Sequence, residues 1–313
     1  MLFGKNRITN IPKKGIFAKL FDEMVKLLRQ FRCGLLYKSR RSFHMKLNEL
    51  QIVGRRCRMF NFDEYMVVFP NAKINIGLFV TGKRPDGFHN LETVFYPIEL
   101  RDILEITEIK GERGSCVFTS TGIPIDCPPE KNLVSKAYAI LADEFDLPSV
   151  DVHLHKMIPY GAGLGGGSAD AAFMLVGLNQ LFSLGLNEER LTGYAARVGS
   201  DCPFFVLNRP VFAFGKGELM ETIDVSLRGY HVVLVKPDRG VATPEAYRGI
   251  TPRAASFDLR ELGKLPVEQW NGVVVNDFED SVIPKVPEIQ EIKHTLRELG
   301  AVYVSMTGSG SAV

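Results

Sequence analysis

A glycine-rich loop between an apolar strand and an apolar helix is the feature that most constrains this chain. It holds five glycines, and its residues are Pro159, Tyr160, Gly161, Ala162, Gly163, Leu164, Gly165, Gly166, Gly167, Ser168 and Ala169. Glycine allows positive φ angles and leaves backbone N–H groups uncovered, so such a loop can wrap around phosphate oxygens. The helix that follows points its positive end at the same place. The loop therefore predicts a site for a nucleotide triphosphate, with the Ser168 hydroxyl available to a phosphate or to its Mg²⁺.

Three other glycine-loop families fit less well. A Walker A loop needs a lysine after its last glycine, where this chain has Ser168. A dinucleotide fingerprint matches the glycines formally, but its acidic residue would be Glu188, which the pattern places in a helix instead of at a strand end. The protein-kinase motifs HRD and DFG do not occur in the sequence. A glycine-rich turn without a ligand is the structural alternative.

Charge is distributed unevenly, although the formal net charge of the 313 residues is only +2. Residues 1–65 hold 15 Lys/Arg against 5 Asp/Glu, whereas the remainder holds 23 basic and 31 acidic residues. Residues 14–32 also place apolar side chains at helical spacing. A membrane-surface helix and an organelle transit peptide are two interpretations. We favour a third, in which residues 1–65 are a basic extension outside the folded domain, because Met66 begins a good strand.

The cysteines are too irregular for a disulfide framework or a zinc site, since they form no CxxC pair and are odd in number: Cys33, Cys57, Cys116, Cys127 and Cys202. The sequence contains no run of 18 apolar residues, which a membrane span would need. The cysteine pattern therefore favours a cytoplasmic protein. We also expect a monomer or weak homodimer that binds neither nucleic acid nor membrane.

Strands and helices alternate from Met66 onward. Strands are predicted at 67–69, 74–80, 91–95, 102–109, 150–155 and 230–236. Helices are predicted at 133–145, from Ser168 to about Leu184, and from Asn187 to about Val198, with Asn132 and Asn187 as N-caps. This succession predicts an α+β protein of two lobes.

The loop sequence PYGAGLGGGSADAA resembles the phosphate loop of the small-molecule kinases that include galactokinase, homoserine kinase and mevalonate kinase. Four further stretches narrow the resemblance: FPNAKINIGLFV (69–80), KRPDGFHNLETVF (83–95), VGSDCPFF (198–205) and MTGSGSAV (306–313). Within the superfamily, AKIN together with RPDGFH resembles the kinases that act on 4-diphosphocytidyl-2-C-methyl-D-erythritol. The resemblance spans roughly residues 66–313.

This resemblance implies both a fold and a reaction. The lobe 66–225 would resemble ribosomal protein S5 domain 2 and bind ATP, and the lobe 226–313 would resemble ferredoxin. ATP with Mg²⁺ would phosphorylate the 2-hydroxyl of the cytidyl substrate, a step of non-mevalonate isoprenoid precursor biosynthesis. Relatives continue beyond the motif in which this chain ends, so we expect the lobe 226–313 to be incomplete.

The resemblance also implies a catalytic pair, Lys73 and Asp201. The carboxylate of Asp201 would accept the proton of the substrate hydroxyl. The ammonium of Lys73 would keep that carboxylate ionised and would stabilise charge on the reacting oxygens. The structural alternatives are a turn aspartate that caps the helix at Pro203 and a lysine at a strand edge with a solvated head.

Five residues match the family's substrate site: Asn75, Phe88, His89, Thr243 and Tyr247. The implied roles are a hydrogen bond from Asn75, stacking of cytosine on Phe88 and reading of its polar edge by His89. The family usually has tyrosine where this chain has Phe88, so stacking is kept and a hydroxyl contact is lost. Thr243 and Tyr247, in VATPEAY, match more loosely.

Asn132 matches the family's adenine-side NL motif and fits a helix cap equally well, so both interpretations stay open. Asn276, Asp277 and Glu279 match an NDLE stretch that we expect to hold the C-terminal lobe together.

His153 and His155 share a strand face with Asp151. We interpret this face as exposed and polar, and we expect no metal site built by the protein, because Mg²⁺ would arrive with ATP.

Two other functions remain as alternatives. One is a kinase of the same superfamily for homoserine or mevalonate derivatives, which would have no use for Phe88 and His89. The other is a non-catalytic nucleotide-binding protein, which the loss of Lys73 or Asp201 would have favoured. Both residues are present.

Overall fold

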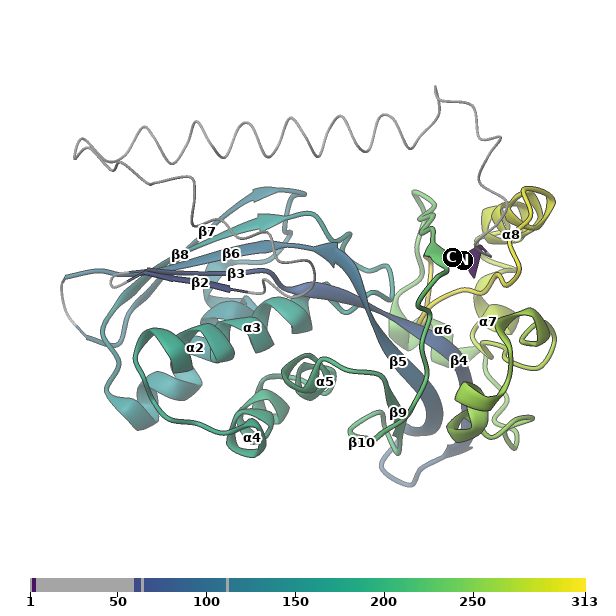
Figure 1. Ribbon diagram of the computed structural model, residues 1–313, viewed down its shortest axis with the longest axis horizontal. Helices are drawn as coiled ribbons and strands as arrows, with labels where there is room; N and C mark the ends of the chain where they lie inside the picture. The colour runs from purple at the N-terminus through teal and green to yellow at the C-terminus, as the bar shows by residue number, and fades with distance from the viewer. Residues whose placement is uncertain (1, 4–58, 63–64, 111–112) are drawn as a thin grey trace. The chain divides into compact units, whose positions relative to one another are not determined.

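The computed structural model describes residues 2–3, 59–62, 65–110 and 113–313, all of which belong to one structural unit (Figure 1). Its strands are β1 (Leu2–Phe3), β2 (Met59–Phe62), β3 (Tyr65–Val68), β4 (Asn71–Lys83), β5 (His89–Arg101), β6 (Ile103–Glu108), β7 (Cys116–Gly122), β8 (Val150–Lys156), β9 (Val211–Phe214), β10 (Leu219–Thr222) and β11 (His231–Val232). Its α-helices are α2 (Leu133–Phe145), α3 (Gly166–Leu181), α4 (Glu188–Val198), α5 (Cys202–Leu207), α6 (Thr243–Arg248), α7 (Glu279–Val282) and α8 (Glu288–Glu298). Short 3₁₀ turns are Pro129–Lys131, Leu259–Lys264 and Val267–Gln269.

Two sheets form the scaffold. The five-stranded sheet has the order β2-β3-β6-β8-β7, in which only the β7–β8 pair is parallel. The four-stranded sheet has the order β10-β9-β5-β4 and is antiparallel throughout. Buried and partly exposed residues alternate along β3 and β6, as expected for strands with one face on a core. Helices α2 to α5 cover that face (Figure 1).

Strand β4 differs from the others because residues 71–80 are all buried. Ile74 and Ile76 belong to one hydrophobic cluster, and Leu78 and Val80 belong to another that includes α7 and α8. On the edge of β4 that is not paired with β5, the Leu78 N–H donates to the Val275 carbonyl at 2.8 Å. The strand is therefore enclosed between the sheet and the C-terminal segment, and polar residues on it are held inside the protein.

Helix α3, which follows the glycine loop, is anchored by burial nearly all round, with ten of its residues buried. Gly177 lets it approach the sheet, because a Cβ there would lie 2.6 Å from Cδ1 of Ile106. Such close packing fixes the position of the helix start, and hence of the loop that leads into it.

Several sequence predictions are confirmed. The chain is α+β, and α2 and α4 begin where their caps predict: Oδ1 of Asn132 accepts from the Val134 N–H and Oδ1 of Asn187 from the Arg190 N–H, both at 2.9 Å. The strand predicted at 150–155 is β8, and the helix predicted after the loop is α3, which ends at Leu181 instead of near Leu184.

Other predictions were wrong in extent. The strand predicted at 230–236 is reduced to His231–Val232, which pairs with Leu2–Phe3. Its remaining apolar residues are held by other contacts, such as the paired backbone hydrogen bonds between Val235 and Val313. The domain also begins before Met66, because β2 (Met59–Phe62) pairs with β3 and extends the five-stranded sheet. The amphipathic pattern at 14–32 lies outside the described residues.

The cap of α2 gives a stability prediction. Replacing Asn132 with alanine removes the acceptor for the Val134 N–H and should lower the free energy of unfolding by about 1 kcal/mol. Asn132→Ser restores an oxygen at the same place and should recover most of that loss. Urea denaturation monitored by circular dichroism measures both. Equal stability of the alanine variant and the wild type would contradict the role of Asn132 as a cap.

Candidate active site

Lys73 is the central side chain of the site and is only 5% exposed, because it lies on the enclosed part of β4. Its Nζ donates to Oδ1 of Asn75 at 2.7 Å and lies 3.8 Å from Oδ2 of Asp201. The ring of Phe95 on β5 faces the same ammonium, with 4.6 Å from Nζ to the ring centre. These neighbours hold the cation in one position, which is what catalysis by positioned charge requires.

Asp201 stands immediately before α5, and its side chain is 35% exposed. Its carboxylate makes no capping hydrogen bond to α5 within the described structure, so the capping alternative has no support. Burial lowers the pKa of Lys73, and the carboxylate of Asp201 acts in the opposite sense by favouring the ammonium form. A buried cation thus faces a carboxylate that solvent and a ligand can reach.

Asn75 lies on the same side of β4 as Lys73, as predicted. Its Oδ1 accepts from Lys73, and its Nδ2 donates at 2.9 Å to the hydroxyl of Thr93, which in turn donates to the Gly77 carbonyl. Much of its hydrogen-bonding capacity is therefore used inside the protein. The geometry makes Asn75 a support for the Lys73 ammonium.

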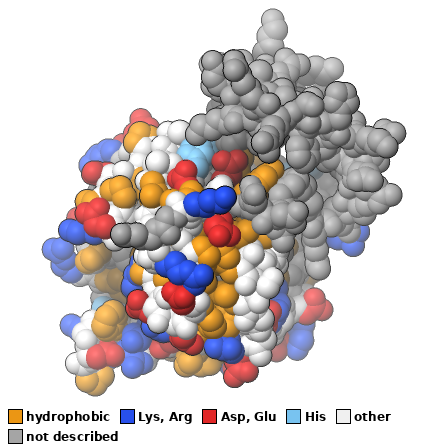
Figure 2. All heavy atoms as spheres, turned by 90° about the vertical axis from the view of Figure 1, so that its left-hand side faces the viewer, with side chains coloured by type: hydrophobic (Ala, Val, Ile, Leu, Met, Phe, Trp, Pro, Cys, Tyr) orange, Lys and Arg blue, Asp and Glu red, His pale blue; other side chains and the backbone are white. Residues whose placement is uncertain are grey.

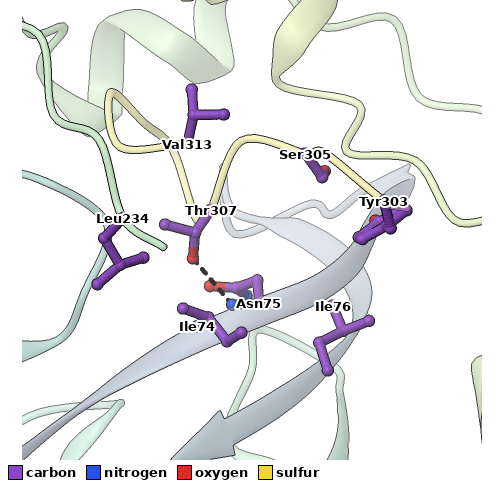
Figure 3. A pocket seen from close by; sticks show the side chains of 8 residues that line it. All are labelled: Ile74, Asn75, Ile76, Leu234, Tyr303, Ser305, Thr307 and Val313. Carbon is purple, nitrogen blue, oxygen red and sulfur yellow. Dashed lines mark hydrogen bonds between the residues drawn. The ribbon is translucent and has the colours of Figure 1, made fainter. Parts of the chain in front are cut away.

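The C-terminal segment closes over this part of β4. The Asn75 N–H donates to Oγ1 of Thr307 at 2.9 Å, the bond drawn in Figure 3. The space left between β4 and residues such as Ser305 and Val313 is a cavity of about 20 Å³, which is room for a water molecule at most. The family motif at residues 306–313 therefore packs directly against the strand that carries Lys73.

Positive φ angles shape the phosphate loop, as its glycines predict: Gly161 has φ 64°, Gly163 75° and Gly165 70°. Gly165 is the N-cap of α3, and within the described structure no side chain caps this helix start. The first N–H groups of α3 have no partner within the helix, so they are suited to bind phosphate oxygens. This conformation fits the predicted nucleotide site.

The loop is also bound to its surroundings. The Lys73 N–H donates to the carbonyl of Leu164 at 3.0 Å, which fixes the loop to β4. A Cβ on Gly165 would lie 2.7 Å from the ring of Phe205, and one on Gly163 would overlap the carbonyl of Thr307. These two glycines are thus required by contact as well as by φ. Tyr160, by contrast, projects outward and is 71% exposed.

Ser168 lies in the first turn of α3, beside the thiol of Cys202. Burial raises the pKa of Cys202 to about 11, which keeps it a thiol at neutral pH. Ser168 thereby stands close to the residue that follows Asp201, so the end of the phosphate loop approaches the start of α5.

Two of the residues matched to the substrate site, His89 and Tyr247, have their rings in contact. The rings of His89 and Tyr247 stack with 4.9 Å between centres and an interplanar angle of 20°. Phe88 is 59% exposed, and Nζ of Lys216 lies 5.0 Å from its ring centre. Burial raises the pKa of Tyr247, and Asp201 raises it further, which places the stack within electrostatic reach of Asp201.

The remaining predicted residues make other contacts. Thr243 begins α6, and its hydroxyl lies 2.9 Å from that of Ser309 in the motif at residues 306–313. Asn132 caps α2, which confirms one of its two interpretations. Its contact with adenine stays a prediction. Asn276 donates to the carbonyls of Met306 and Gly308, so it holds the motif at residues 306–313 in place, as expected of the residues that match the NDLE stretch.

The histidine face of β8 is less open than predicted. The Nε2 of His153 and the Nδ1 of His155 both lie 3.0 Å from Oγ1 of Thr121 on β7, and His155 is only 9% exposed. Within the described residues no group of three or more His, Cys, Asp or Glu side chains could hold a metal ion.

A buried charged cluster beneath the loop escaped the sequence analysis. Lys156, the last residue of β8, contacts Asp102 and Asp170, and all three are at most 3% exposed. The available signals were a lysine directly before the loop and an aspartate among the small residues directly after it. Neither signal reveals burial.

Comparison with known proteins identifies the family. Residues 132–209 match the model of the GHMP kinases N terminal domain, and residues 252–313 match that of the GHMP kinases C terminal domain. The 4-diphosphocytidyl-2-C-methyl-D-erythritol kinases of Parabacteroides distasonis and Bacteroides fragilis are each 54% identical to this chain over 248 residues, which is 79% of this chain and 90% of theirs. That of Chlorobium phaeobacteroides is 40% identical over 77% of this chain and 85% of its own.

Similarity to solved structures indicates the same family. A crystal structure of 4-(cytidine 5'-diphospho)-2C-methyl-D-erythritol kinase matches with a TM-score of 0.62 and 31% identity, covering 79% of this chain and 88% of that one. The mevalonate kinase of Methanococcus jannaschii, 12% identical with a TM-score of 0.56 over 79% of this chain and 88% of its own, shares the fold. These likenesses confirm the predicted two-lobed kinase fold, and the chain belongs to the 4-diphosphocytidyl-2-C-methyl-D-erythritol kinase family of the GHMP kinases.

Proposed function

We propose that this chain transfers the γ-phosphate of ATP to the 2-hydroxyl of 4-diphosphocytidyl-2-C-methyl-D-erythritol, with Asp201 as the base and Lys73 as the fixed cation. GHMP kinases use ATP as phosphate donor, and the relatives described above are named for this substrate. The observation that carries the proposal is the pairing of a buried ammonium with an accessible carboxylate, beside a loop that leads into a helix start which no described side chain caps. Phosphoryl transfer needs this combination of positioning, charge neutralisation and a proton acceptor.

The roles follow from the geometry. The loop and the start of α3 would bind the triphosphate, with Mg²⁺ held by phosphate oxygens and water and with the Ser168 hydroxyl available as a further ligand. The half-exposed Asp201 can meet a hydroxyl at the mouth of the site and take its proton. Lys73 cannot move away, because Asn75 and the Phe95 ring hold it, so its charge is in place before the reaction begins.

Phe88, His89 and Tyr247 would bind the cytosine. Phe88 offers an exposed ring face for stacking, while the His89–Tyr247 stack fixes the imidazole at the edge of the same site. Thr243 and Ser309 would close the site from the C-terminal lobe.

We further propose a small-molecule enzyme that acts in the cytoplasm as a monomer or weak homodimer, without nucleic acid or membrane partners. On the face seen in Figure 2, acidic and basic side chains are interspersed instead of gathered by sign. Among the described residues, no helix combines the length and apolar character needed to cross a bilayer.

The reaction itself can be tested with γ-labelled ATP and three acceptors: the cytidyl substrate, homoserine and mevalonate. We expect label in the 2-phosphate of the cytidyl substrate and none in the other two. Transfer to homoserine or mevalonate alone would make this a different kinase of the same superfamily. ATP binding without transfer to any acceptor would favour a nucleotide-binding protein.

Removing the carboxylate of Asp201 should stop turnover without preventing nucleotide binding. Asp201→Asn should lower kcat by about 10²- to 10⁴-fold, because the substrate hydroxyl loses its proton acceptor. Isothermal titration calorimetry should give an ATP Kd close to that of the wild type. Asp151→Asn, which neutralises an exposed carboxylate on β8, serves as the matched control and should leave kcat unchanged. Near-normal kcat in purified Asp201→Asn would remove the proposed base.

The burial of Lys73 predicts an alkaline limit to activity. Because burial lowers its pKa, the ammonium loses its proton at a pH below the ordinary lysine value of 10.5, and kcat should fall as the pH rises through that point. Since Asp201 favours the charged form, Asp201→Asn should move the titration of Lys73 to still lower pH. Heteronuclear NMR of the lysine side chain measures this shift. A titration that is unchanged or moves upward would contradict the coupling of the two groups.

Substitution of Phe88 should change the KM for the cytidyl substrate and leave the KM for ATP unchanged. Phe88→Leu removes the aromatic face and should raise KM for the cytidyl substrate by about tenfold, since stacking contributes on the order of 1–3 kcal/mol. Phe88→Tyr keeps the ring and should stay within about twofold of the wild type. Steady-state kinetics with each substrate varied in turn should show an unchanged KM for ATP. A rise in both KM values would show that Phe88 supports the whole site instead of contacting the cytosine ring alone.

A further inference from the structure

The buried cluster of Lys156, Asp102 and Asp170 lies directly under the phosphate loop, and none of its members has a role in the proposed chemistry. Nζ of Lys156 donates to Oδ2 of Asp102 at 2.5 Å and to Oδ2 of Asp170 at 2.7 Å. Lys156 and Asp170 are 3% and 2% exposed, and Asp102 is fully buried. Charges so deeply buried destabilise a fold unless each is paired, so their presence calls for a purpose beyond packing.

The cluster joins the two ends of the loop. Oδ1 of Asp102 accepts from the N–H groups of Met157 and Ile158, which lead into the loop. Asp170 lies in α3, just after the loop. Lys156 bonds to both carboxylates and therefore spans the gap between the loop's beginning and its end.

The ammonium of Lys156 also supports the loop from below. A Cβ placed on Gly166, the first residue of α3, would lie 2.9 Å from Nζ of Lys156 and 2.8 Å from Cγ2 of Ile158. The backbone at Gly166 therefore rests on these two side chains. The side chains of Lys156 and Ile158 therefore position the N–H groups that would face the triphosphate.

The same cluster reaches the strand that carries Lys73. The Asp102 N–H donates to the carbonyl of Pro70 at 2.8 Å, directly before β4 begins. One buried set of hydrogen bonds thus connects the start of β4, the end of β8 and the start of α3, the three segments around the proposed nucleotide site.

Burial and charge act against each other within the cluster. Burial raises the pKa of Asp170 well above its ordinary value; Lys156 opposes that rise and Asp102 adds to it. Burial acts to lower the pKa of Lys156, but the two carboxylates outweigh it and raise the pKa overall. Oδ1 of Asp170 has no hydrogen-bond partner among the described residues.

We propose that Lys156, Asp102 and Asp170 are positioning residues that hold both ends of the phosphate loop in the nucleotide-binding conformation, so that this cluster determines ATP affinity. The proposal rests on the proposed function, since it takes the loop to be the ATP site. None of the three touches a substrate, so they act through the loop backbone.

Two substitutions at one position provide the test. Asp170→Leu has nearly the same shape but offers Lys156 no acceptor, and it should raise the ATP Kd by about tenfold, since small displacements of a positioned group have large effects. Asp170→Asn keeps an oxygen for Lys156 and should stay within about twofold of the wild type. The cytidyl-substrate KM and kcat at saturating ATP should change by less than about threefold in both variants, because the groups at the reacting centre are untouched.

Stability has to be separated from positioning. Thermal unfolding of each variant shows whether a change in Kd comes from a folded protein. If Asp170→Leu does not fold, Lys156→Met/Asp102→Asn/Asp170→Leu removes the cation together with both charged carboxylates, a replacement that proteins often tolerate, and the amide introduced at position 102 keeps an oxygen for the Met157 and Ile158 N–H groups. A folded variant with a wild-type ATP Kd would overturn the proposal, and so would failure of both variants to fold, because the cluster would then be a structural element of the lobe. Absence of ATP binding by the wild type would instead refute the proposed function.

Discussion

The site depends on keeping one lysine charged inside the protein. An ammonium group taken out of water loses several kcal/mol of solvation unless new partners replace it. Here the partners come from three places: Asn75 on the same strand, Phe95 on the neighbouring strand and Asp201 before α5. The β4–β5 register, the approach of α5 and the anchoring of the loop at Leu164 all serve to bring these groups around Nζ.

Local chemistry explains which parts of the fold could be predicted. Asn132 and Asn187 precede helices because their side chains bind the first free N–H groups, and this signal lies within four residues of sequence. The alternation in β8 is equally local. The strand at 230–236 was overestimated because an apolar run shows burial without showing which strand will pair with it. The strand Met59–Phe62 was overlooked because the excess of basic residues in 1–65 outweighed a short apolar segment.

Site residues could be predicted where the residue type itself indicates the chemistry. They were overlooked where their role depends only on their position in the folded structure. Lys73 and Asp201 follow from family motifs, and the structure places them 3.8 Å apart. Thr307 could not be foreseen as a partner of the Asn75 backbone, because that contact depends on folding of the whole domain. Lys156 and Asp102 look like ordinary surface residues in the sequence, since burial depends on tertiary structure.

The bond between Asn75 and Thr307 joins residues 232 positions apart. During synthesis on the ribosome, the sheet and helices of the first lobe emerge early and can begin to pack while residues 306–313 have not yet been made. Lys73 then lacks the segment that encloses β4, and Gly163 has no carbonyl to rest against. The nascent chain is therefore able to assemble much of its first lobe before residues 306–313 enclose β4, so that the surroundings of Lys73 are completed only after the lobe that carries it.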